Sequence, residues 1–377
     1  MINFFSERTI ELIEYTRPSI MYPFSSMIRS RNAHNDLSFN GIKLSVAVAR
    51  TTVSHHLNLP EFWFDSIVSA LGVGKFVSGA TTDLRLVHNR LSRLRDFSRT
   101  SRIGEFAQGV TYLFAQEKLG YPIVVDFEKF CSDNGISTSG TDSTPDFVCQ
   151  KNILNKNVML LESKGSTIPS TIKRVLRKGK RQCNNGRKIL KSAGFSVDNR
   201  YSLCTRLSFD TTPGTKSIIH FVDPDDDVPI TEYNDGLFKF HYASLFYLIG
   251  DFENVNALIK GANISKDKVR YDEIKLGDET YYLFDSGYLY DLQRKLFKKN
   301  YVPYPDYLFD IFHWEFFHRN FNQVGIEKRV FDALTGERPL ERIPEFKLYS
   351  DYEFDGKRVN TFADGTIVML NWKERKG

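Results

Sequence analysis

The chain has 377 residues, which is too long for one ordinary hydrophobic core and long enough for two or three. With 41% hydrophobic, 14% aromatic and 26% charged residues, the composition is that of a packed globular protein and excludes a disordered chain. The net charge of +5 favours polyanionic partners only weakly, because an excess of this size is common in proteins that bind no nucleic acid.

The cysteine pattern and the hydropathy exclude further classes. Four cysteines at irregular spacing, without a CxxC pair, argue against both a zinc ribbon and a disulfide framework. The chain opens on MINFFSERTIELIEY, where three glutamates interrupt any apolar run, so we expect neither a signal peptide nor a membrane span there. No later stretch reaches about 18 uncharged apolar residues. We therefore expect a soluble, cytoplasmic protein with no membrane partner.

Residues 1–102 predict a mainly helical N-terminal region. The best helical periodicity lies in 58–72 and 83–97, where apolar residues recur at intervals of three and four. The polar side of the second pattern is basic, because it and the residues after it contain Arg85, Arg90, Arg93, Arg95, Arg99 and Arg102. A solvated helix face and a contact with phosphates both explain this charge.

Residues 103–222 predict a compact α/β unit with a sheet at its centre. A helix begins near 103 and ends before Gly120 and Pro122, and strand-like segments follow at 122–130, 144–150 and 157–165. The polar stretch 151–157 suits a hairpin turn. A second helix over about 170–193 and strands at 201–209 and 216–223 complete the unit.

Residues 223–377 predict an α+β C-terminal region. It begins with the acidic loop 223–227, continues through a helix at 238–250 and includes a strongly aromatic block at 301–321. Asp355-Gly356 and Asp364-Gly365 are good turn dipeptides and predict hairpins near the end of the chain. The aromatic block suits a hydrophobic core better than base stacking or a protein interface.

Three charged residues on two neighbouring predicted strands form the strongest chemical signal. Asp146 follows Pro145 at the start of one strand, and Glu162 and Lys164 lie on the next. Because side chains alternate across a strand, Glu162 and Lys164 share a face. If the two strands pair as a hairpin, Asp146 lies beside them.

This set of residues favours a divalent metal. Two carboxylates in a half-buried place repel one another, and a bound cation removes that conflict. Hard carboxylate oxygens suit Mg²⁺ (or Mn²⁺), which keeps several waters and can activate one of them as a nucleophile. Lys164 can then hold the attacking water or stabilise negative charge in the transition state.

The spacing Pro145-Asp146, fifteen residues, Glu162-Ser163-Lys164 resembles the PD-(D/E)xK nuclease superfamily, which has the restriction-endonuclease-like fold. The resemblance covers roughly residues 103–222 and neither flank. It implies Asp146, Glu162 and Lys164 as catalytic residues, with Asp146 and Glu162 as metal ligands. By the position of the preceding helix it points to Glu105 as an auxiliary metal ligand. On the following helix it points to Gln182 or Lys180 as a residue that faces the site.

The helix after the motif predicts a nucleic-acid contact. Between 173 and 191 it contains nine basic residues and no acidic one. The alternative is a charged helix that only faces solvent, although its like charges would repel one another. The residues that we expect to contact phosphates, with an affinity that falls steeply with salt, are Lys173, Arg174, Arg177, Lys178, Lys180 and Arg181.

The sequence therefore predicts Mg²⁺-dependent hydrolysis of phosphodiesters in DNA, in an α/β protein with a restriction-endonuclease-like core. By family analogy, a role in restriction or anti-phage defence is an expectation. The alternatives are a catalytically idle binding module of the same fold and an RNA-cleaving nuclease. A homo-oligomer or a regulatory partner subunit is compatible with the resemblance. No phosphate-loop or dinucleotide motif is present, and the spacing of His313 and His318 does not suit zinc.

Overall fold

The computed structural model describes residues 6–16, 28–29, 35–52, 63–138, 143–151, 157–222, 236–284, 323–339 and 351–371. The chain divides into two compact units, which we call unit 1 (Met1–His55 and Asp65–Leu237) and unit 2 (His56–Phe64 and Phe238–Gly377). The acidic loop 223–227, the aromatic block 301–321 and both histidines within it lie outside the described residues.

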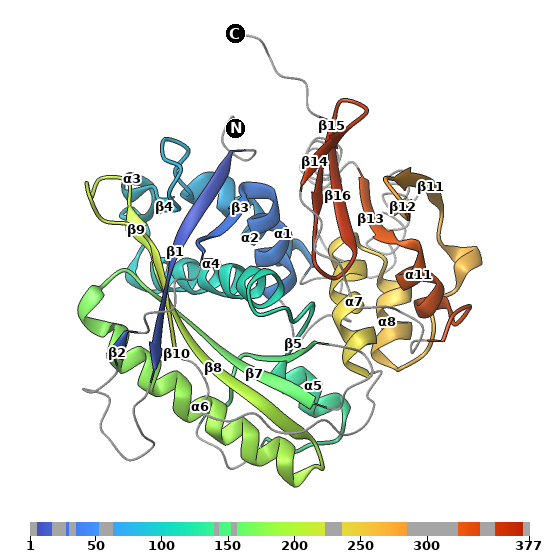
Figure 1. Ribbon diagram of the computed structural model, residues 1–377, viewed down its shortest axis with the longest axis horizontal. Helices are drawn as coiled ribbons and strands as arrows, with labels where there is room; N and C mark the ends of the chain where they lie inside the picture. Colours follow the sequence, from blue (N-terminus) through green and yellow to red (C-terminus); the bar gives the residue numbers. More distant parts are fainter. Residues whose placement is uncertain are drawn as a thin grey trace. The chain divides into compact units, whose positions relative to one another are not determined.

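Unit 1 is built on a mixed sheet that has eight strands in the described part of the chain (Figure 1). The strand order is β2-β1-β10-β8-β7-β6-β5, and β3 pairs with β1. Strands β5, β6 and β7 form an antiparallel meander, and β8 runs parallel to β7. The strands are β1 (Glu7–Thr16), β2 (Ile28–Arg29), β3 (Leu37–Asn40), β5 (Ile123–Asp126), β6 (Phe147–Gln150), β7 (Asn157–Ser166), β8 (Ser196–Arg206) and β10 (Ile218–Val222).

Helices cover both faces of β7. The α4 helix (Asp96–Glu117) packs on the face of Ser163, whose hydroxyl lies 2.8 Å from that of Thr111. The α6 helix (Ile172–Ser192) packs on the opposite face, where the Ser202 hydroxyl donates to the Leu176 carbonyl at 2.9 Å. Figure 1 shows these two helices on either side of the sheet. The remaining helices of unit 1 are α1 (Gly41–Thr52), α2 (Trp63–Phe76), α3 (His88–Leu91) and α5 (Phe127–Asp133).

The prediction of a mainly helical N-terminal region is wrong for the residues that the structure describes before Gly41, which contain β1, β2 and β3. Strand β1 pairs in parallel with β10, with Ile13 opposite His220, so the start of the chain extends the central sheet. Within β1, Ile10 and Leu12 are buried and Glu11 between them is partly exposed, as the alternation of side chains along a strand requires. Because the pairing strand β10 lies about 200 residues further along the chain, the local sequence around β1 does not indicate this pairing.

The helix predicted over 83–97 is also corrected. This segment contains a two-residue strand, β4 (Arg85–Leu86), which pairs with β9 (Ser208–Phe209), and then the short helix α3. Leu84, Leu86 and Leu91 are buried, but Phe97 at the end of the same pattern is 84% exposed, so the apolar periodicity identified only part of the buried set. Arg85 and Leu86 form a strand rather than a helix because their backbone groups pair with β9.

Unit 2 contains an antiparallel sheet of six strands in order β11-β12-β13-β16-β15-β14. Both predicted hairpins are present, and Asp355 and Gly356 have φ of 50° and 66°, as a two-residue type I′ turn requires. The predicted helix at 238–250 is also present as α7. The elements of unit 2 are α7 (Gly236–Leu248), α8 (Phe252–Ile259), β11 (Tyr271–Leu276), β12 (Glu279–Phe284), β13 (Gln323–Glu327), α11 (Lys328–Thr335), β14 (Tyr352–Phe354), β15 (Lys357–Thr361) and β16 (Thr366–Asn371).

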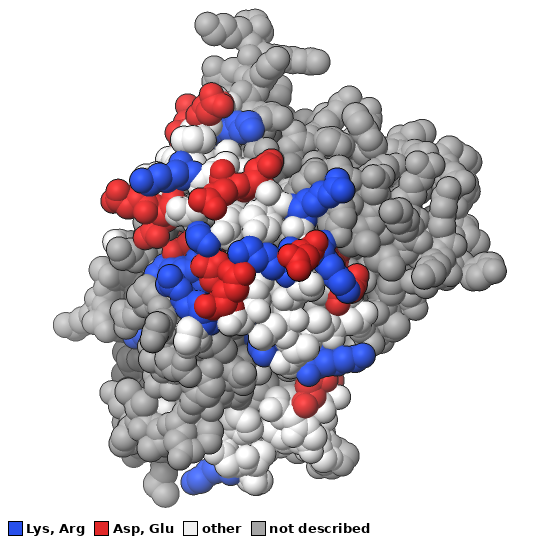
Figure 2. Space-filling view, turned by 90° about the vertical axis from the view of Figure 1, so that its right-hand side faces the viewer, with Lys and Arg blue, Asp and Glu red and all other residues white. Residues whose placement is uncertain are grey.

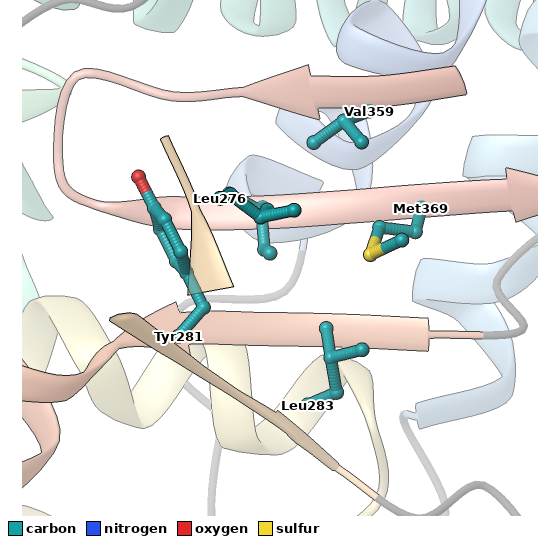
Figure 3. Close-up of a cluster of buried hydrophobic side chains, with 6 residues drawn as sticks. Leu276, Tyr281, Leu283, Val359 and Met369 are labelled. Atoms are coloured by element: carbon teal, nitrogen blue, oxygen red, sulfur yellow. The ribbon is translucent and has the colours of Figure 1, made fainter. Parts of the chain in front are cut away.

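One face of this second sheet holds a cluster of six buried apolar side chains (Figure 3). Gly325 lies against this cluster. A Cβ at this position would stand 2.6 Å from a methyl of Leu283 and 3.0 Å from Ile367, so there is no room for a side chain. Unit 2 thus has a hydrophobic core of its own. None of the helices in the described segments combines the length and apolar character needed to cross a bilayer.

Candidate active site

The three motif residues meet where β6 begins and β7 continues beyond it. Backbone pairing between these strands ends at Phe147 opposite Leu161. One step further on, the Asp146 N–H donates to Glu162 Oε2 at 3.0 Å, and the Ser163 N–H donates to Asp146 Oδ2 at 2.8 Å. Each carboxylate therefore accepts a backbone N–H of the neighbouring strand, and the two acids are fixed to the sheet that carries them.

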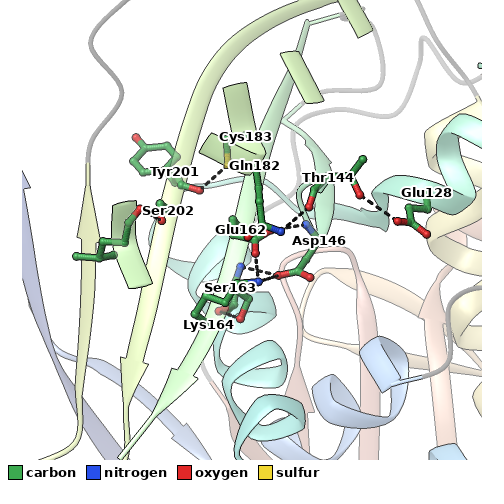
Figure 4. Close-up of polar contacts among 12 residues, drawn as sticks. Glu128, Thr144, Asp146, Glu162, Ser163, Lys164, Gln182, Cys183, Tyr201 and Ser202 are labelled. Atoms are coloured by element: carbon green, nitrogen blue, oxygen red, sulfur yellow. Dashed lines mark hydrogen bonds and ion pairs between the residues drawn. The ribbon is translucent and has the colours of Figure 1, made fainter. Parts of the chain in front are cut away.

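Lys164 completes the group. Its ammonium forms an ion pair with Glu162 and lies 3.9 Å from Asp146 Oδ2. Figure 4 shows the three side chains pointing toward one another. The Glu162 side chain is fully buried, whereas Asp146 and Lys164 remain 25% and 27% exposed. The site is therefore closed beneath Glu162 and open to solvent at the aspartate and the lysine.

The surroundings of the site shift the pKa values of both Asp146 and Lys164 away from their ordinary values. Burial raises the pKa of the Asp146 carboxyl, and nearby Glu128 raises it further, against the opposing effects of Lys164 and the Ser163 N–H. Burial also lowers the pKa of the Lys164 ammonium; Asp146 opposes this change and Lys178 adds to it. The charged forms of both side chains are therefore less favourable in the folded protein than they are in water.

The α6 helix approaches the site closely because it carries two glycines. A Cβ at Gly179 would lie 2.2 Å from Ser202 Oγ and 3.0 Å from Glu162 Cγ. A Cβ at Gly186 would lie 2.6 Å from Pro145 Cδ. Only glycine permits such an approach of helix to strand. The helix is therefore in contact with the strand ends that carry both acids.

Gln182 occupies a supporting position. Its Nε2 donates to the Thr144 carbonyl at 2.8 Å, and one turn later Asn185 Nδ2 donates to the Ser143 carbonyl at 3.1 Å. These bonds hold the segment that precedes Asp146, and Figure 4 shows the one between Gln182 and Thr144. The sequence placed Gln182 at the site, and the structure brings it there as a residue that orients the backbone of the motif.

A third acid near the site was missed by the sequence analysis. Glu128, in the first turn of α5, accepts a hydrogen bond from the Thr144 hydroxyl at 3.0 Å and is close enough to raise the pKa of Asp146. The signal that could have indicated it is Asp126, which caps α5 and so places the start of that helix beside the motif.

Glu105 lies apart from this group. Its carboxylate accepts a hydrogen bond from Arg102 at 2.6 Å, and Arg102 also donates to the Ser69 hydroxyl of α2 at 3.2 Å. Among the residues that the structure describes, no three His, Cys, Asp or Glu side chains are placed to hold one metal ion. The predicted auxiliary ligand is therefore not brought to Asp146 and Glu162.

Five of the six residues predicted to contact phosphates are exposed on α6: Lys173, Arg174, Arg177, Lys178 and Arg181. Lys180 is buried and does not belong to this surface, which corrects its assignment. The helix repeats every 3.6 residues, so a continuous basic run must place one member against the sheet. Lys178 links the basic surface to the site, because it affects the pKa of Lys164.

No protein-family model matches the chain, and neither a curated protein nor a solved structure matches it. Function is therefore argued from the site itself.

Proposed function

We propose that this protein is a Mg²⁺-dependent nuclease that hydrolyses phosphodiester bonds in DNA. The observation that carries the proposal is the convergence of Asp146, Glu162 and Lys164 at one strand end, with both acids fixed by backbone N–H groups. Preorganised charges that are costly to maintain are typical of catalytic centres.

The topology of unit 1 supports the resemblance to PD-(D/E)xK nucleases. Helix α4 precedes an antiparallel meander of three strands, and α6 then leads to β8, which is parallel to β7. The aspartate begins the second strand of this series, and the glutamate and lysine lie on the third. These are the positions that the resemblance implies for the restriction-endonuclease-like fold.

The site fits a divalent cation such as Mg²⁺ or Mn²⁺. Its donors are two carboxylates facing a single ammonium, and Mg²⁺ in phosphoryl-transfer sites is held by one or two carboxylates together with water and substrate. Asp146 and Glu162 would hold the ion, and Glu105 is not required. The bound ion would supply a water of lowered pKa and neutralise charge on a phosphodiester oxygen.

Lys164 acts on the reacting groups from the open side of the site. Its ammonium is partly exposed and is held between both acids, so it can donate to an attacking water or to a phosphate oxygen. Its lowered pKa reduces the cost of a change in its protonation during the reaction. Gln182 keeps Asp146 in place through the Thr144 carbonyl.

The α6 surface supports a nucleic acid as substrate. Its exposed lysines and arginines adjoin the site through Lys178 and have no acidic residue on the same helix. A row of cations beside a hydrolytic centre suits a phosphate backbone, whose binding releases counterions. DNA and RNA both have a phosphate backbone, so cleavage assays on DNA and RNA of matched sequence are needed to decide which is the substrate.

The decisive experiment is plasmid cleavage by wild type, Asp146→Asn, Glu162→Gln and Glu105→Gln, with Mg²⁺ or Mn²⁺ and with EDTA. We expect nicking or linearisation that is lost in EDTA and in the first two variants and is retained by Glu105→Gln. Glu253→Gln, at an exposed ion pair in unit 2, is the surface control. Cleavage by Asp146→Asn would overturn the assignment. DNA binding without cleavage in either metal would indicate the idle binding module.

A further inference from the structure

The first turn of α4 presents an unusual apolar side chain to solvent. Phe97 is 84% exposed, compared with 55% for Ile168 and 39% for Phe354, the other large apolar side chains exposed among the described residues. From Ile103 onward α4 contributes a continuous series of side chains to the core, but Asp96–Ser101 projects beyond it. Phe97 thus contributes little to packing. A single exposed apolar side chain is common on protein surfaces, so any binding role for Phe97 depends on the residues around it.

Three of the six other residues in segment 93–99 are arginines. The side chains of Arg93 and Arg95 are exposed, and their guanidinium groups form no hydrogen bond or ion pair with any described residue. Arg99 is paired with Asp96 at 2.6 Å, and Arg90 donates to the Lys75 carbonyl at 2.5 Å. The segment 93–99 therefore combines an exposed aromatic ring with two uncompensated guanidinium groups.

Segment 93–99 and the candidate active site are joined through strand β7. A Cβ at Gly165, the residue after Lys164, would lie 2.6 Å from the Ile103 carbonyl, so α4 contacts β7 next to Lys164 in the chain, on the face opposite to that of the Lys164 side chain. Phe97 precedes Ile103 by six residues, which is roughly 9 Å along a helix. That separation is about the rise of two or three nucleotides along a strand.

We propose that segment 93–99 binds an unpaired base of the substrate, which stacks on Phe97 while Arg93 and Arg95 contact its phosphates. An aromatic ring with neighbouring cations is the combination that single-stranded nucleic acids use. Bases within a duplex are already stacked and offer no face to an external ring. The substrate class is therefore DNA with a single-stranded portion, such as an end, a gap or a flap. This inference rests on the proposed nuclease function of the same unit.

The test is equilibrium binding in EDTA, so that cleavage does not interfere, to a labelled single strand and to a blunt duplex of the same sequence. Base–aromatic stacking contributes about 1–3 kcal/mol, so Phe97→Ala is expected to weaken single-strand binding by roughly 5- to 150-fold. Duplex binding is expected to stay within about twofold, because α6 supplies the phosphate contacts there. Phe97→Trp is expected to retain affinity and to show additional fluorescence quenching by the single strand.

The matched control is Phe354→Ala, which removes the same side chain from the exposed hairpin of unit 2. It is expected to bind like wild type. Phe97→Ala is expected to keep the wild-type melting temperature because its ring is 84% exposed, whereas Phe354→Ala, at a side chain that is 39% exposed, is expected to lower it slightly. Unchanged single-strand binding by Phe97→Ala overturns this inference, as does an equal loss of duplex binding. If binding depends on Phe97 but wild type cleaves no DNA with Mg²⁺ or Mn²⁺, the nuclease proposal fails instead.

Discussion

The basic helix of unit 1 and the charged surface of unit 2 arrange their charges differently. Helix α6 contains nine lysines and arginines and no acid. In unit 2, some surface lysines have acidic partners, as in Lys266–Glu337 at 2.9 Å and Lys268–Glu253. Figure 2 shows Lys and Arg interspersed with Asp and Glu over the described part of one face.

This difference shows why the net charge of the chain said little about function. Paired surface charges contribute about 0–1 kcal/mol and need no further explanation. A helix with like charges at intervals of three and four residues is destabilised by their repulsion, by about 0.2–0.5 kcal/mol for each pair. A run of cations next to buried acids is therefore more informative than an overall excess of five. Substitutions in each unit can separate these two kinds of charge.

The largest expected effect is at the lysine between the two acids. Lys164→Met keeps the length of the side chain and removes its charge, and we expect cleavage to fall by about 10²- to 10³-fold, as for the loss of one preorganised donor in an active site. Lys268→Met removes a paired surface lysine from unit 2 and is expected to leave the rate unchanged. Single-turnover cleavage of a labelled DNA measures both. Equal rates for the two variants would contradict the role of Lys164.

A smaller effect concerns the approach of α6 to the sheet. Gly179→Ala places a methyl group against Ser202 and Glu162, and such overpacking costs about 1–3 kcal/mol of the free energy of unfolding. Gly104→Ala is the matched control, since its Cβ would meet nothing within 4 Å and alanine favours a helix by about 0.5–1 kcal/mol. Denaturant unfolding of both variants measures the difference. A stabilised Gly179→Ala would show that α6 is not held against the site.

The surface charges themselves are expected to act through salt dependence. Lys173→Gln with Arg174→Gln removes two exposed cations from α6. The slope of log affinity against log salt is expected to become shallower by about 0.9 for each duplex phosphate that these side chains neutralise in the wild-type complex. The double variant Lys266→Gln with Lys268→Gln removes the same charge from unit 2, and its slope is expected to match wild type. If both pairs change the slope equally, binding depends on net charge rather than on α6.

The smallest effect is on stability against pH. Because burial raises the pKa of Asp146, the folded protein holds this proton at higher pH than the unfolded chain does. The free energy of unfolding therefore decreases as pH rises from the unfolded pKa through the folded one. Asp146→Asn cannot ionise, and its Oδ1 can still accept the Ser163 N–H. In EDTA we expect this variant to melt above wild type at neutral pH and to match it in acid.

Thermal denaturation over a pH series measures this difference, and Glu253→Gln serves as an exposed control with little expected change. A lower melting temperature for Asp146→Asn at neutral pH would show that the aspartate stabilises the fold. Adding Mg²⁺ is expected to stabilise wild type more than the variant, because a ligand that binds only the native state raises its stability.

Much of the candidate site could be predicted from local sequence. Alternation along β7 correctly placed Glu162 and Lys164 on one face, and the polar turn correctly predicted the β6–β7 hairpin that brings Asp146 to them. Gln182 was indicated only by the family resemblance, which pointed to Gln182 or Lys180 on the following helix, and local sequence did not choose between them. Glu105 could not, since its partner Arg102 and the contact with Ser69 depend on how α4 meets α2.

Local sequence correctly predicted β6 and β7, the basic helix and the turns at Asp355-Gly356 and Asp364-Gly365. The strand predicted over 122–130 is wrong in its second half, where β5 ends at Asp126 and α5 begins at Phe127. Periodicity reports which side chains are buried, but it does not name the element that buries them. Only the tertiary structure decided that β1 extends the sheet, that Lys180 turns inward and that Phe97 stays outside. These outcomes depend on contacts between residues far apart in the chain, whose free energies no local pattern encodes.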